Sequence, residues 1–567
     1  MVEILQNKLG KKIILLGNEA IVRGALEAGV NFVSTYPGTP ASEIGNTFFR
    51  IAKEGGPYFE FSTNEKVALE AGIGASFSGL KTLVAMKNFG LNVCLDALIP
   101  FVYTGTKGPT VIIVADDPSC HSSAQSEENT RPIEHLVHLP ILEPSDPQEC
   151  LDFTKLAFEI SEKFKIPVMI RTTTRVAHQR MPVKLGDYES GIKNKVEFIK
   201  DPKRFITLPP RVLEMKKELL EKIEKIREFS EKSKINKTEG NRKSKIGIIT
   251  SAISYLYVKE SLKELNLDLP VLKLGVFYPS PNKKTKNFIK DLKKVLIVEE
   301  LEASLEEWVK GLAKEVNPKL QIFGKNLLPT VGELKPEYVI LAIAKISNKK
   351  YKIQNTKYKI PASKRLPQLC PGCPYWLVIS AIKKAVDVEK VIFGGEIGCY
   401  MLFGNSPINL QDYLSCMGSS VGIAHGIKKA GSAFAPPPLK FRRASKAQAR
   451  KQKVIAFVGD SSFFHAGIPA LINTVFNKSN PLIIILENQT TAMTGHQPHP
   501  GAPVIPNGIK IENIVSACGV KNLKVIDPIN QEEFTKTVKE FLEKDEVSVI
   551  IARRPCIFVA QKYEKKT

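Results

Sequence analysis

The sequence lacks the features of a membrane protein or a secreted protein. Its longest apolar runs, such as residues 483–486, are far shorter than the ~18 consecutive apolar residues that a transmembrane helix needs. The first residues contain no basic segment followed by an apolar stretch, so we expect no secretory signal. Nine cysteines, an odd number scattered through 567 residues, do not have the density of a disulfide framework. We therefore expect a cytoplasmic protein with reduced thiols and no membrane contact.

Acidic residues are outnumbered, with 58 Asp and Glu against 81 Lys and Arg and a formal net charge of +23. Much of the surplus lies in segments that connect domains. Residues 347–364 hold six basic and no acidic side chains, and residues 431–453 hold seven basic and no acidic ones. Because no signature of an RNA- or DNA-binding module accompanies this charge, we expect no nucleic-acid partner.

The length is sufficient for three or four domains. With 43 % apolar and 25 % charged residues, the composition is that of an ordinary soluble globular protein. The predicted division, in chain order, is a first α/β domain (1–210), a helix and linker (211–245), a middle α/β domain (246–346), a basic linker (347–364) and a third α/β domain (365–567) with a surface insertion at 431–453.

Alternating strands and helices predict an α/β fold with three doubly wound units. Apolar runs at 13–17 and 110–114 suit buried parallel strands, and the helix-like stretch 65–78 ends at Gly79. A charged helix is predicted from 211 to about 230, because apolar residues recur there three or four positions apart. These residues are Val212, Met215, Leu219, Ile223 and Ile226. The polar tract 231–245 that follows is interpreted as a linker.

Two predicted strands of the third domain end in oxygen-bearing side chains. The strand at 454–458 is followed by Gly459 and Asp460, and the strand at 482–486 is followed, after Glu487, by Asn488. Adjacent parallel strands would bring Asp460 and Asn488 together at the edge where α/β sheets bind ligands. These oxygens suit Mg²⁺, which also takes phosphate oxygens, while Gly459 and the following helix N-terminus favour a bound anion. The alternative is a plain turn with a helix-capping Asn.

Five motifs occur along the chain, and their residues are YPGTPASE (36–43), NEKVALEAG (64–72), MKNFGLN (86–92), CPGCP (370–374) and TTAMTGHQ (490–497). In this order they resemble the large subunit of indolepyruvate:ferredoxin oxidoreductase, an archaeal and bacterial 2-oxoacid oxidoreductase. The resemblance covers about residues 12–557. It implies that the first domain binds the pyrimidine ring of thiamine diphosphate and that the third domain binds its diphosphate, with a smaller α/β domain between them.

The resemblance also implies roles for residues of the first domain. Glu65 matches the glutamate that shares a proton with the pyrimidine ring, which in turn deprotonates the thiazolium carbon to a nucleophile. Thr39 matches a threonine that contacts the oxoacid end of the substrate. Arg131 is a candidate partner for the substrate carboxylate, because a guanidinium binds carboxylates through two donors. For Glu65 and Arg131, the alternative is an ordinary solvated surface side chain.

In the third domain, the same resemblance assigns Mg²⁺ to Asp460, Asn488 and the backbone carbonyl of Thr490. Ser461 stands where the family commonly has a glycine next to the diphosphate. Met493 falls near the substrate, where an apolar wall would suit an aryl side chain, although a core methionine is the alternative.

Four cysteines match those that hold a [4Fe–4S] cluster in related enzymes, namely Cys370, Cys373, Cys399 and Cys556. Four thiolates are the usual donor set for such a cluster. The C-x-x-C pair alone is ambiguous, so structural zinc and unligated thiols stay open. The other five cysteines are interpreted as buried small hydrophobes. They are Cys94, Cys120, Cys150, Cys416 and Cys518.

The implied reaction is the oxidative decarboxylation of an aryl 2-oxoacid such as indolepyruvate to the aryl-acetyl-CoA, with reduction of ferredoxin. The implied partners are a smaller subunit in a hetero-oligomer, ferredoxin and coenzyme A. The chain departs from the family in having Tyr375-Trp376 where His-Arg is typical, and in lacking the cysteine-rich ferredoxin-like tail after Cys556. We therefore expect electrons to leave through a separate polypeptide or directly to ferredoxin. A non-oxidative thiamine-diphosphate decarboxylase and a non-catalytic scaffold subunit are the alternatives.

Overall fold

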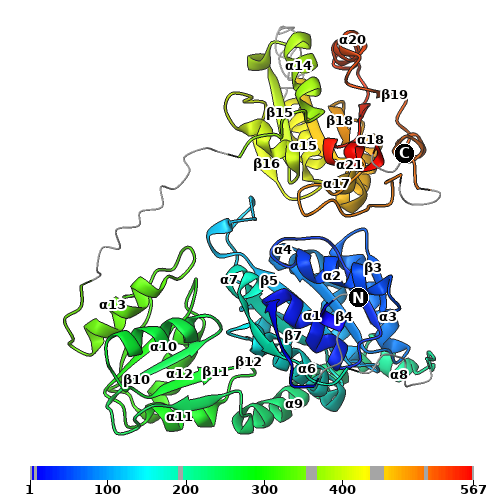
Figure 1. Cartoon of the computed structure of the whole chain (residues 1–567). Helices are drawn as coiled ribbons and strands as arrows, with labels where there is room; N and C mark the ends of the chain where they lie inside the picture. Colours follow the sequence, from blue (N-terminus) through cyan, green and yellow to red (C-terminus); the bar gives the residue numbers. More distant parts are fainter. Residues whose placement is uncertain are drawn as a thin grey trace. The chain divides into compact units, whose positions relative to one another are not determined.

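The computed structural model describes residues 3–5, 9–188, 196–352, 367–433, 453–503 and 508–564. The chain divides into two compact units, Met1–Tyr358 and Lys359–Thr567 (Figure 1). Most of the expected basic linker at 347–364 and of the expected insertion at 431–453 lies outside the described residues. Within the described ranges, no helix is both long enough and apolar enough to cross a lipid bilayer.

The first sheet of unit 1 has seven strands in the order β12-β6-β7-β5-β4-β2-β3, all parallel except β12. The strands are β2 (Phe32–Thr35), β3 (Tyr58–Phe61), β4 (Thr82–Lys87), β5 (Thr110–Asp116), β6 (Ile141–Leu142), β7 (Val168–Thr173) and β12 (Val276–Tyr278). All seven residues of β5 are buried, as expected for a central strand covered on both faces. Helices α1 (Gly17–Glu27), α2 (Ser42–Ala52) and α6 (Pro147–Phe164) pack on one face, and α3 (Glu65–Phe77) and α4 (Asn88–Thr104) pack on the other.

One predicted strand of this domain pairs differently from expectation. The apolar run at 13–17 forms β1 (Lys12–Leu16), which pairs antiparallel with β8 (Arg180–Lys184) in a separate two-stranded sheet. The prediction of a buried parallel strand is wrong there, because only alternate side chains are buried and Ile14 is 71 % exposed. The predictions of a strand at 110–114 and of a helix beginning at Glu65 are confirmed by β5 and α3.

The second sheet of unit 1 has the order β14-β13-β10-β11-β9. Its strands are β9 (Lys237–Glu239), β10 (Ile246–Ser251), β11 (Val271–Leu274), β13 (Lys294–Val298) and β14 (Gln321–Phe323). The helices around it are α9 (Arg211–Lys232), α10 (Ser254–Glu264), α11 (Asn282–Ile289), α12 (Leu305–Val316) and α13 (Pro336–Ile346). The tract interpreted as a linker contributes β9, which pairs antiparallel with β11. Strand β12 follows β11 in the chain but pairs with β6 of the first sheet. The buried apolar clusters contain residues of both sheets, so the two sheets share continuous apolar cores.

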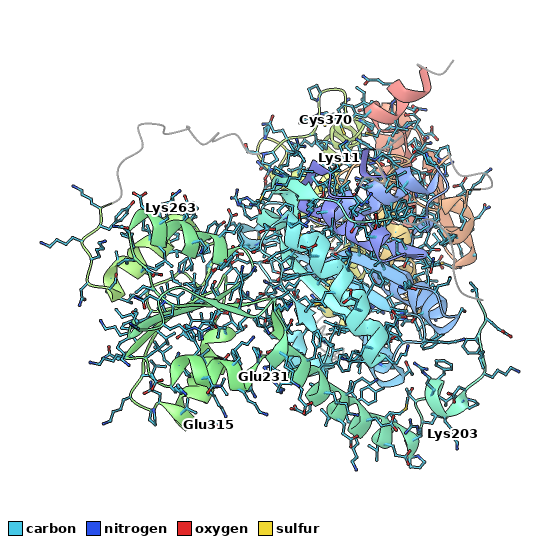
Figure 2. All side chains as sticks on the ribbon, turned by 60° about the horizontal axis from the view of Figure 1, so that its bottom comes forward. Lys11, Lys203, Glu231, Lys263, Glu315 and Cys370 are labelled. Carbon is cyan, nitrogen blue, oxygen red and sulfur yellow. The ribbon has the colours of Figure 1, made fainter. Side chains whose placement is uncertain are left out.

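Helix α9 buries one apolar seam, as its sequence predicts. The buried residues of the helix are Met215, Leu219, Ile223, Ile226 and Ser230. Charged side chains of unit 1 such as Lys203, Lys263 and Glu315 are exposed, and Figure 2 shows them on the outside of the ribbon. The surface charge of this unit is therefore of mixed sign.

Unit 2 is built on a six-stranded parallel sheet in the order β16-β15-β17-β18-β20-β19. Its strands are β15 (Val391–Glu396), β16 (Tyr413–Ser415), β17 (Lys453–Gly459), β18 (Leu482–Glu487), β19 (Asn522–Ile526) and β20 (Ser548–Arg553). Helices α14 (Tyr375–Ala385) and α20 (Gln531–Phe541) cover one face, and α15 (Ser419–Ala433), α18 (Ile468–Phe476) and α19 (Ile511–Ala517) cover the other. The predicted α/β class is confirmed in both units.

Candidate active site

Glu65 lies at the carboxyl edge of the first sheet, where the loops after β2, β4 and β5 come together. It is the first residue of α3, and the side chain of Asn64 caps this helix by accepting a hydrogen bond from the Val67 N–H at 2.9 Å. Glu65 is only 5 % exposed. A Cβ at Gly90 in α4 would lie 2.5 Å from Glu65 Cγ, so only glycine leaves room for this carboxyl side chain. The alternative of a solvated surface glutamate is therefore excluded by the burial of Glu65.

Thr39 belongs to the loop between β2 and α2 at the same edge. It is half-buried, and its Oγ1 lies 3.2 Å from Ser42 Oγ, the first residue of α2. Because β2 and β4 are neighbours in the sheet, this loop and the start of α4 lie side by side. Thr39 and Glu65 thus occupy the same edge of one sheet.

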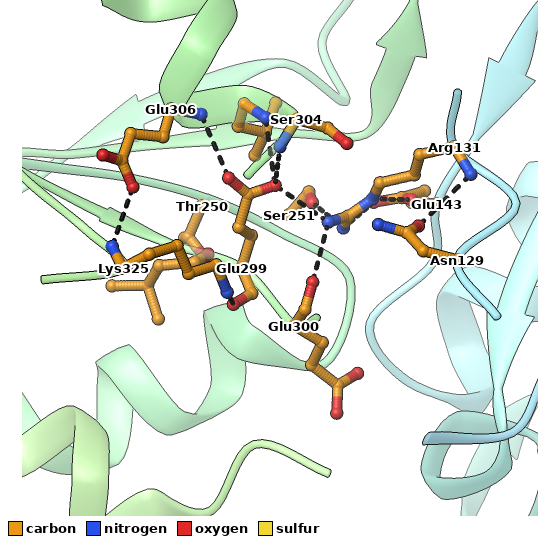
Figure 3. Close-up of polar contacts among 12 residues, drawn as sticks. Asn129, Arg131, Glu143, Thr250, Ser251, Glu299, Glu300, Ser304, Glu306 and Lys325 are labelled. Carbon is orange, nitrogen blue, oxygen red and sulfur yellow. Dashed lines mark hydrogen bonds and ion pairs between the residues drawn. The ribbon is translucent and has the colours of Figure 1, made fainter. Parts of the chain in front are cut away.

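Arg131 does not fit the substrate-binding role expected from the sequence. Its Nε and Nη2 donate to the two carboxylate oxygens of Glu143 at 2.8 Å, and Nη2 also donates to Ser251 Oγ at 2.9 Å. Its Nη1 donates to Glu299 Oε2 at 3.0 Å and to the Glu300 carbonyl at 3.5 Å (Figure 3). The side chain is 1 % exposed and all five N–H donors are engaged, so none is left for a substrate. Arg131 instead joins the first sheet of unit 1 to the second.

Opposite charges balance one another in this interior. Burial raises the pKa of Glu143, but Arg131 and Arg171 outweigh that effect and lower it to about 2. Arg171 also donates through Nε to Asp116 Oδ2 at 2.8 Å, at the end of β5. The carboxyl end of the first sheet is therefore partly filled by structural ion pairs that involve both arginines.

Replacing Arg131 by methionine should destabilise unit 1 by about 3–5 kcal/mol, because it leaves Glu143 and Glu299 buried without their cation. The control is Arg175→Met, which removes a 54 % exposed guanidinium bound to Glu333 and should cost less than about 1 kcal/mol. Urea unfolding of the full chain, followed by circular dichroism, measures both variants. Equal losses of stability would contradict the structural role of Arg131.

In unit 2, Asp460 and Asn488 lie at the ends of two paired strands, as predicted. Strands β17 and β18 are parallel neighbours, with Gly459 opposite Leu486. Asp460 is 2 % exposed and accepts hydrogen bonds from the Ser461 N–H at 2.8 Å and from the Gln489 N–H at 2.7 Å. The second of these bonds connects the loop after β18 directly to the end of β17.

Asn488 is oriented by its neighbours on both sides of its amide. Its Oδ1 accepts from the Thr490 N–H at 3.0 Å, and its Nδ2 donates to the Tyr375 hydroxyl at 2.7 Å. Tyr375 is therefore the positioning residue for this amide, although the sequence marked it only as a departure from the family. Its neighbour Trp376 is 36 % exposed and donates to the Cys370 carbonyl at 3.3 Å.

These donors fit a hard cation. Asp460 Oδ1 accepts one N–H and keeps a second acceptor position, and Asn488 Oδ1 does likewise, whereas Asp460 Oδ2 faces both the Gln489 N–H and His499 Nε2. In the described parts of the chain, no group of three or more His, Cys, Asp and Glu side chains is arranged to hold a metal by itself. A cation at this edge would therefore need further oxygen ligands from backbone, phosphate or water.

Other predicted residues of unit 2 surround this pair. Gly459 is the N-cap of the turn that begins at Asp460, and a Cβ there would lie 2.8 Å from the Tyr400 ring. Ser461 is half-buried in that turn, and Thr490 is 4 % exposed with its hydroxyl donating to the Gln497 carbonyl at 3.3 Å. Met493, by contrast, is 45 % exposed on this unit, so it is not a core methionine.

Two further groups at this edge escaped the sequence analysis. His499 Nδ1 accepts the Gly501 N–H at 3.2 Å, so Nε2 carries the ring proton, and it lies 3.1 Å from Asp460 Oδ2. Glu396 ends β15, next to β17, and burial raises its pKa to about 8, although Tyr400 and Ser462 hydrogen-bond it. Its carboxyl group therefore keeps its proton at neutral pH. In the sequence, His499 is marked only by its position just after the motif at 490–497 and Glu396 only by its position just before Cys399. Neither residue is part of a recognisable motif of its own.

The four predicted cluster cysteines come from three separate segments that lie near one another, but among the described residues no three of them are arranged to hold a metal. Burial raises the pKa of Cys373 to about 11, and the charges of Cys370 and Cys556 add to that effect. Burial also raises the pKa of Cys399 to about 12, with contributions from the other three thiols. A Cβ at Gly372 would lie 2.7 Å from the side chain of Ile557, the residue after Cys556, so the C-x-x-C loop packs beside that segment.

These cysteines also lie close to the Asp460 edge. The Cys556 N–H donates to the Asn488 carbonyl at 3.0 Å, and the Asp460 charge contributes to the raised pKa of Cys399. Of the five remaining cysteines, Cys94 and Cys150 are buried as expected. That expectation is wrong for Cys416, which is exposed, and Cys120 and Cys518 are only partly buried.

Two known protein families match separate parts of this chain. The family described as "Pyruvate flavodoxin/ferredoxin oxidoreductase, thiamine diP-bdg" matches residues 23–239, and "Thiamine pyrophosphate enzyme, C-terminal TPP binding domain" matches residues 396–552. With the α/β fold, these matches define a thiamine-diphosphate-binding oxidoreductase.

Full-length relatives narrow this class. The indolepyruvate oxidoreductase subunit IorA of Methanothermobacter thermautotrophicus is 41 % identical over 98 % of this chain and 88 % of its own length. The IorA proteins of Pyrococcus horikoshii and Archaeoglobus fulgidus are 42 % and 38 % identical over 98 % of this chain, and over 87 % and 88 % of their own lengths. The chain belongs to the IorA family of indolepyruvate oxidoreductase subunits, which confirms the resemblance found in its motifs.

Proposed function

We propose that this chain is the catalytic subunit that oxidatively decarboxylates aryl 2-oxoacids such as indolepyruvate, with coenzyme A as acyl acceptor and ferredoxin as electron acceptor. The observation that carries the proposal is the pair of oxygen-bearing strand ends at Asp460 and Asn488, in a chain that matches IorA relatives over nearly its whole length.

Unit 2 provides the groups for holding magnesium diphosphate. Asp460 and Asn488 would bind Mg²⁺ together with the Thr490 carbonyl, and Tyr375 holds the Asn488 amide in place. Gly459 and Ser461 line the same turn, where backbone N–H groups favour an anion. When bound, thiamine diphosphate supplies a nucleophilic carbon and accepts the electron pair of the broken C–C bond.

Unit 1 provides the acid–base group. Glu65 is a buried carboxyl group at a helix N-terminus, a position that suits the exchange of a proton with the pyrimidine ring. Thr39 shares its sheet edge and would contact the oxoacid end of the substrate. Met493, exposed on unit 2, would contribute an apolar surface for the aryl group.

Four cysteines would hold the cluster that accepts the electrons of the reaction. Cys370, Cys373, Cys399 and Cys556 are the proposed ligands of a [4Fe–4S] cluster, and their mutual electrostatic coupling together with the packing of Gly372 on Ile557 supports this assignment. Single electrons would pass from this cluster to ferredoxin. A smaller partner subunit in a cytoplasmic hetero-oligomer would complete the enzyme.

Side-by-side assays with three 2-oxoacids test the proposed reaction. The full chain is purified anaerobically with its candidate partner subunit, and the CoA-dependent reduction of a low-potential dye is measured with indolepyruvate, pyruvate and 2-oxoglutarate. We expect reduction with indolepyruvate in preference to the other two. Aldehyde release without dye reduction would instead identify a non-oxidative decarboxylase, and activity on pyruvate alone would remove the aryl assignment.

The cluster assignment has its own test. Cys399→Ser should lose iron and acid-labile sulfide together, because a hydroxyl group is a poor substitute for a thiolate ligand. Cys518→Ser is the matched control, since Cys518 is also half-buried but lies at the end of α19, outside the group of four. Iron and sulfide are counted per chain after anaerobic purification. Unchanged iron in Cys399→Ser would exclude the proposed ligand set.

A further inference from the structure

Lys87 places an ammonium group at the edge that holds Glu65 and Thr39. It is the last residue of β4, and its side chain is half-buried. Its Nζ donates to the Ser122 carbonyl at 3.2 Å and to Ser123 Oγ at 2.7 Å, and both acceptors are neutral oxygens. An ammonium has three donors, so within the described ranges these two bonds leave one for a further acceptor.

The loop that carries Thr39 lies directly against this side chain. A Cβ at Gly38 would be 2.9 Å from Lys87 Cγ and 3.0 Å from its Cδ, so glycine is needed where the loop passes the lysine stem. Nζ also lies 4.8 Å from the centre of the Phe89 ring, which holds the cation from another side. The position of the ammonium is therefore fixed by several contacts.

In the described part of the chain Lys87 forms no ion pair, although several acidic groups act on its ammonium from farther away. Burial lowers its pKa to about 8, against the opposing charges of Asp117, Glu65, Cys120 and Glu128. Glu65, at the start of α3, is one of the groups whose negative charge raises the pKa of Lys87. The ammonium therefore interacts electrostatically with the proposed acid–base residue. The two arginines of the same sheet edge, Arg131 and Arg171, form ion pairs with buried carboxylates.

We propose that Lys87 binds the carboxylate of the 2-oxoacid substrate, the role that Arg131 cannot fill. This inference rests on the proposed function of the same site. The recognised chemistry is a carboxylate adjacent to a carbonyl group, and Thr39 would contact the same end of the molecule from the neighbouring loop.

The proposed contact has a kinetic signature. In the reaction, the bond between the carboxylate carbon and the carbonyl carbon breaks, its electron pair stays with the larger fragment, and the carboxylate leaves as neutral CO₂. Its negative charge therefore decreases toward the transition state, so Lys87 favours bound substrate more than the transition state. Removing the ammonium should raise KM roughly 10- to 100-fold and should not lower kcat.

The test compares Lys87→Met with Lys87→Arg and with Lys81→Met in the complete enzyme. Lys81 is the matched control, because it is half-buried just before the other end of β4, where it donates to the Ala28 carbonyl at 3.0 Å. KM and kcat are measured for indolepyruvate and for indoleacetaldehyde, which lacks the carboxylate. We expect Lys87→Met to raise KM for the 2-oxoacid only, Lys87→Arg to restore part of the affinity, and Lys81→Met to change neither constant.

A binding measurement gives a readout that does not depend on turnover. Calorimetry of the cofactor-loaded protein with indole-3-propionate, and with its neutral amide as control, should show that Lys87→Met weakens binding of the carboxylate but not of the amide. In the unmodified protein, KM for indolepyruvate should also rise as the pH increases through about 8, where Lys87 loses its proton. The methionine variant should lack this rise.

The outcomes separate the two proposals. If the unmodified enzyme turns over no 2-oxoacid, the proposed function fails. If it is active but Lys87→Met changes KM less than about twofold, or raises KM for acid and aldehyde equally, the carboxylate-binding role of Lys87 is overturned.

Discussion

Glu65→Gln is expected to lower kcat by roughly 10²–10⁴-fold, the usual contribution of a positioned acid–base group. Glutamine has nearly the same shape, so it still fits the space that Gly90 leaves, but it cannot donate or accept a proton in the same exchange. Steady-state dye reduction with indolepyruvate measures the loss. The protein should keep its thermal stability, because glutamine fills nearly the same space and opens no cavity.

Glu70→Gln is the control for this prediction. Glu70 lies further along the same helix, α3, with its side chain 46 % exposed and paired with Lys66. Its loss should leave kcat unchanged, because exposed pairs contribute little. Comparable activity of Glu65→Gln and Glu70→Gln would remove Glu65 from the proposed catalytic chemistry.

Asp460→Asn should abolish retention of thiamine diphosphate and magnesium. The substitution removes the negative charge for the cation, and it turns one acceptor oxygen into an amide group that opposes the N–H of Ser461 or Gln489. In the unmodified protein, cofactor at 100 times its Kd should add about 2.7 kcal/mol of stability. The variant should show no rise in Tm with added cofactor and should elute from gel filtration without it.

Asp387→Asn provides the matched comparison in the same unit. Asp387 is exposed and pairs with Lys390 at 2.9 Å, so its substitution should leave both cofactor content and Tm shift intact. A variant Asp460→Asn that still binds magnesium and thiamine diphosphate would refute the proposed diphosphate site, whatever its activity.

Local signals predicted the central part of the fold and of the candidate site. Strands β17 and β18 are uninterrupted apolar runs, and such runs form buried parallel strands because both faces must be covered. Asp460 directly follows β17, and Asn488 directly follows β18. Their positions after two such strands were enough to predict that they lie at the same carboxyl edge of the sheet. Glu65 was predicted instead from the resemblance of the motif at 64–72 to the family, and the structure places it at the start of α3 after the capping Asn64.

The same reasoning failed where a strand pairs with a segment that is distant in the sequence. Residues 13–17 are as apolar as a central strand, yet β1 pairs antiparallel with β8, which follows more than 160 residues later. The expected linker contributes β9, because its few residues satisfy the open edge of β11. Neither partner is visible in the local pattern, and strand pairing depends on which segments meet in space.

The sequence by itself determined the α/β class, the family and the strand ends that carry Asp460 and Asn488, because apolar runs and motif order are local properties. Only the tertiary structure decided which charged groups are free to act. The sequence suggested Arg131 as a carboxylate partner, but Glu143 and Glu299 occupy its donors. The ammonium of Lys87, which the sequence placed only within a motif, belongs to a side chain that lies against the Thr39 loop at the edge that holds Glu65. Whether a charge serves structure or substrate depends on its neighbours in space, and those come from distant parts of the chain.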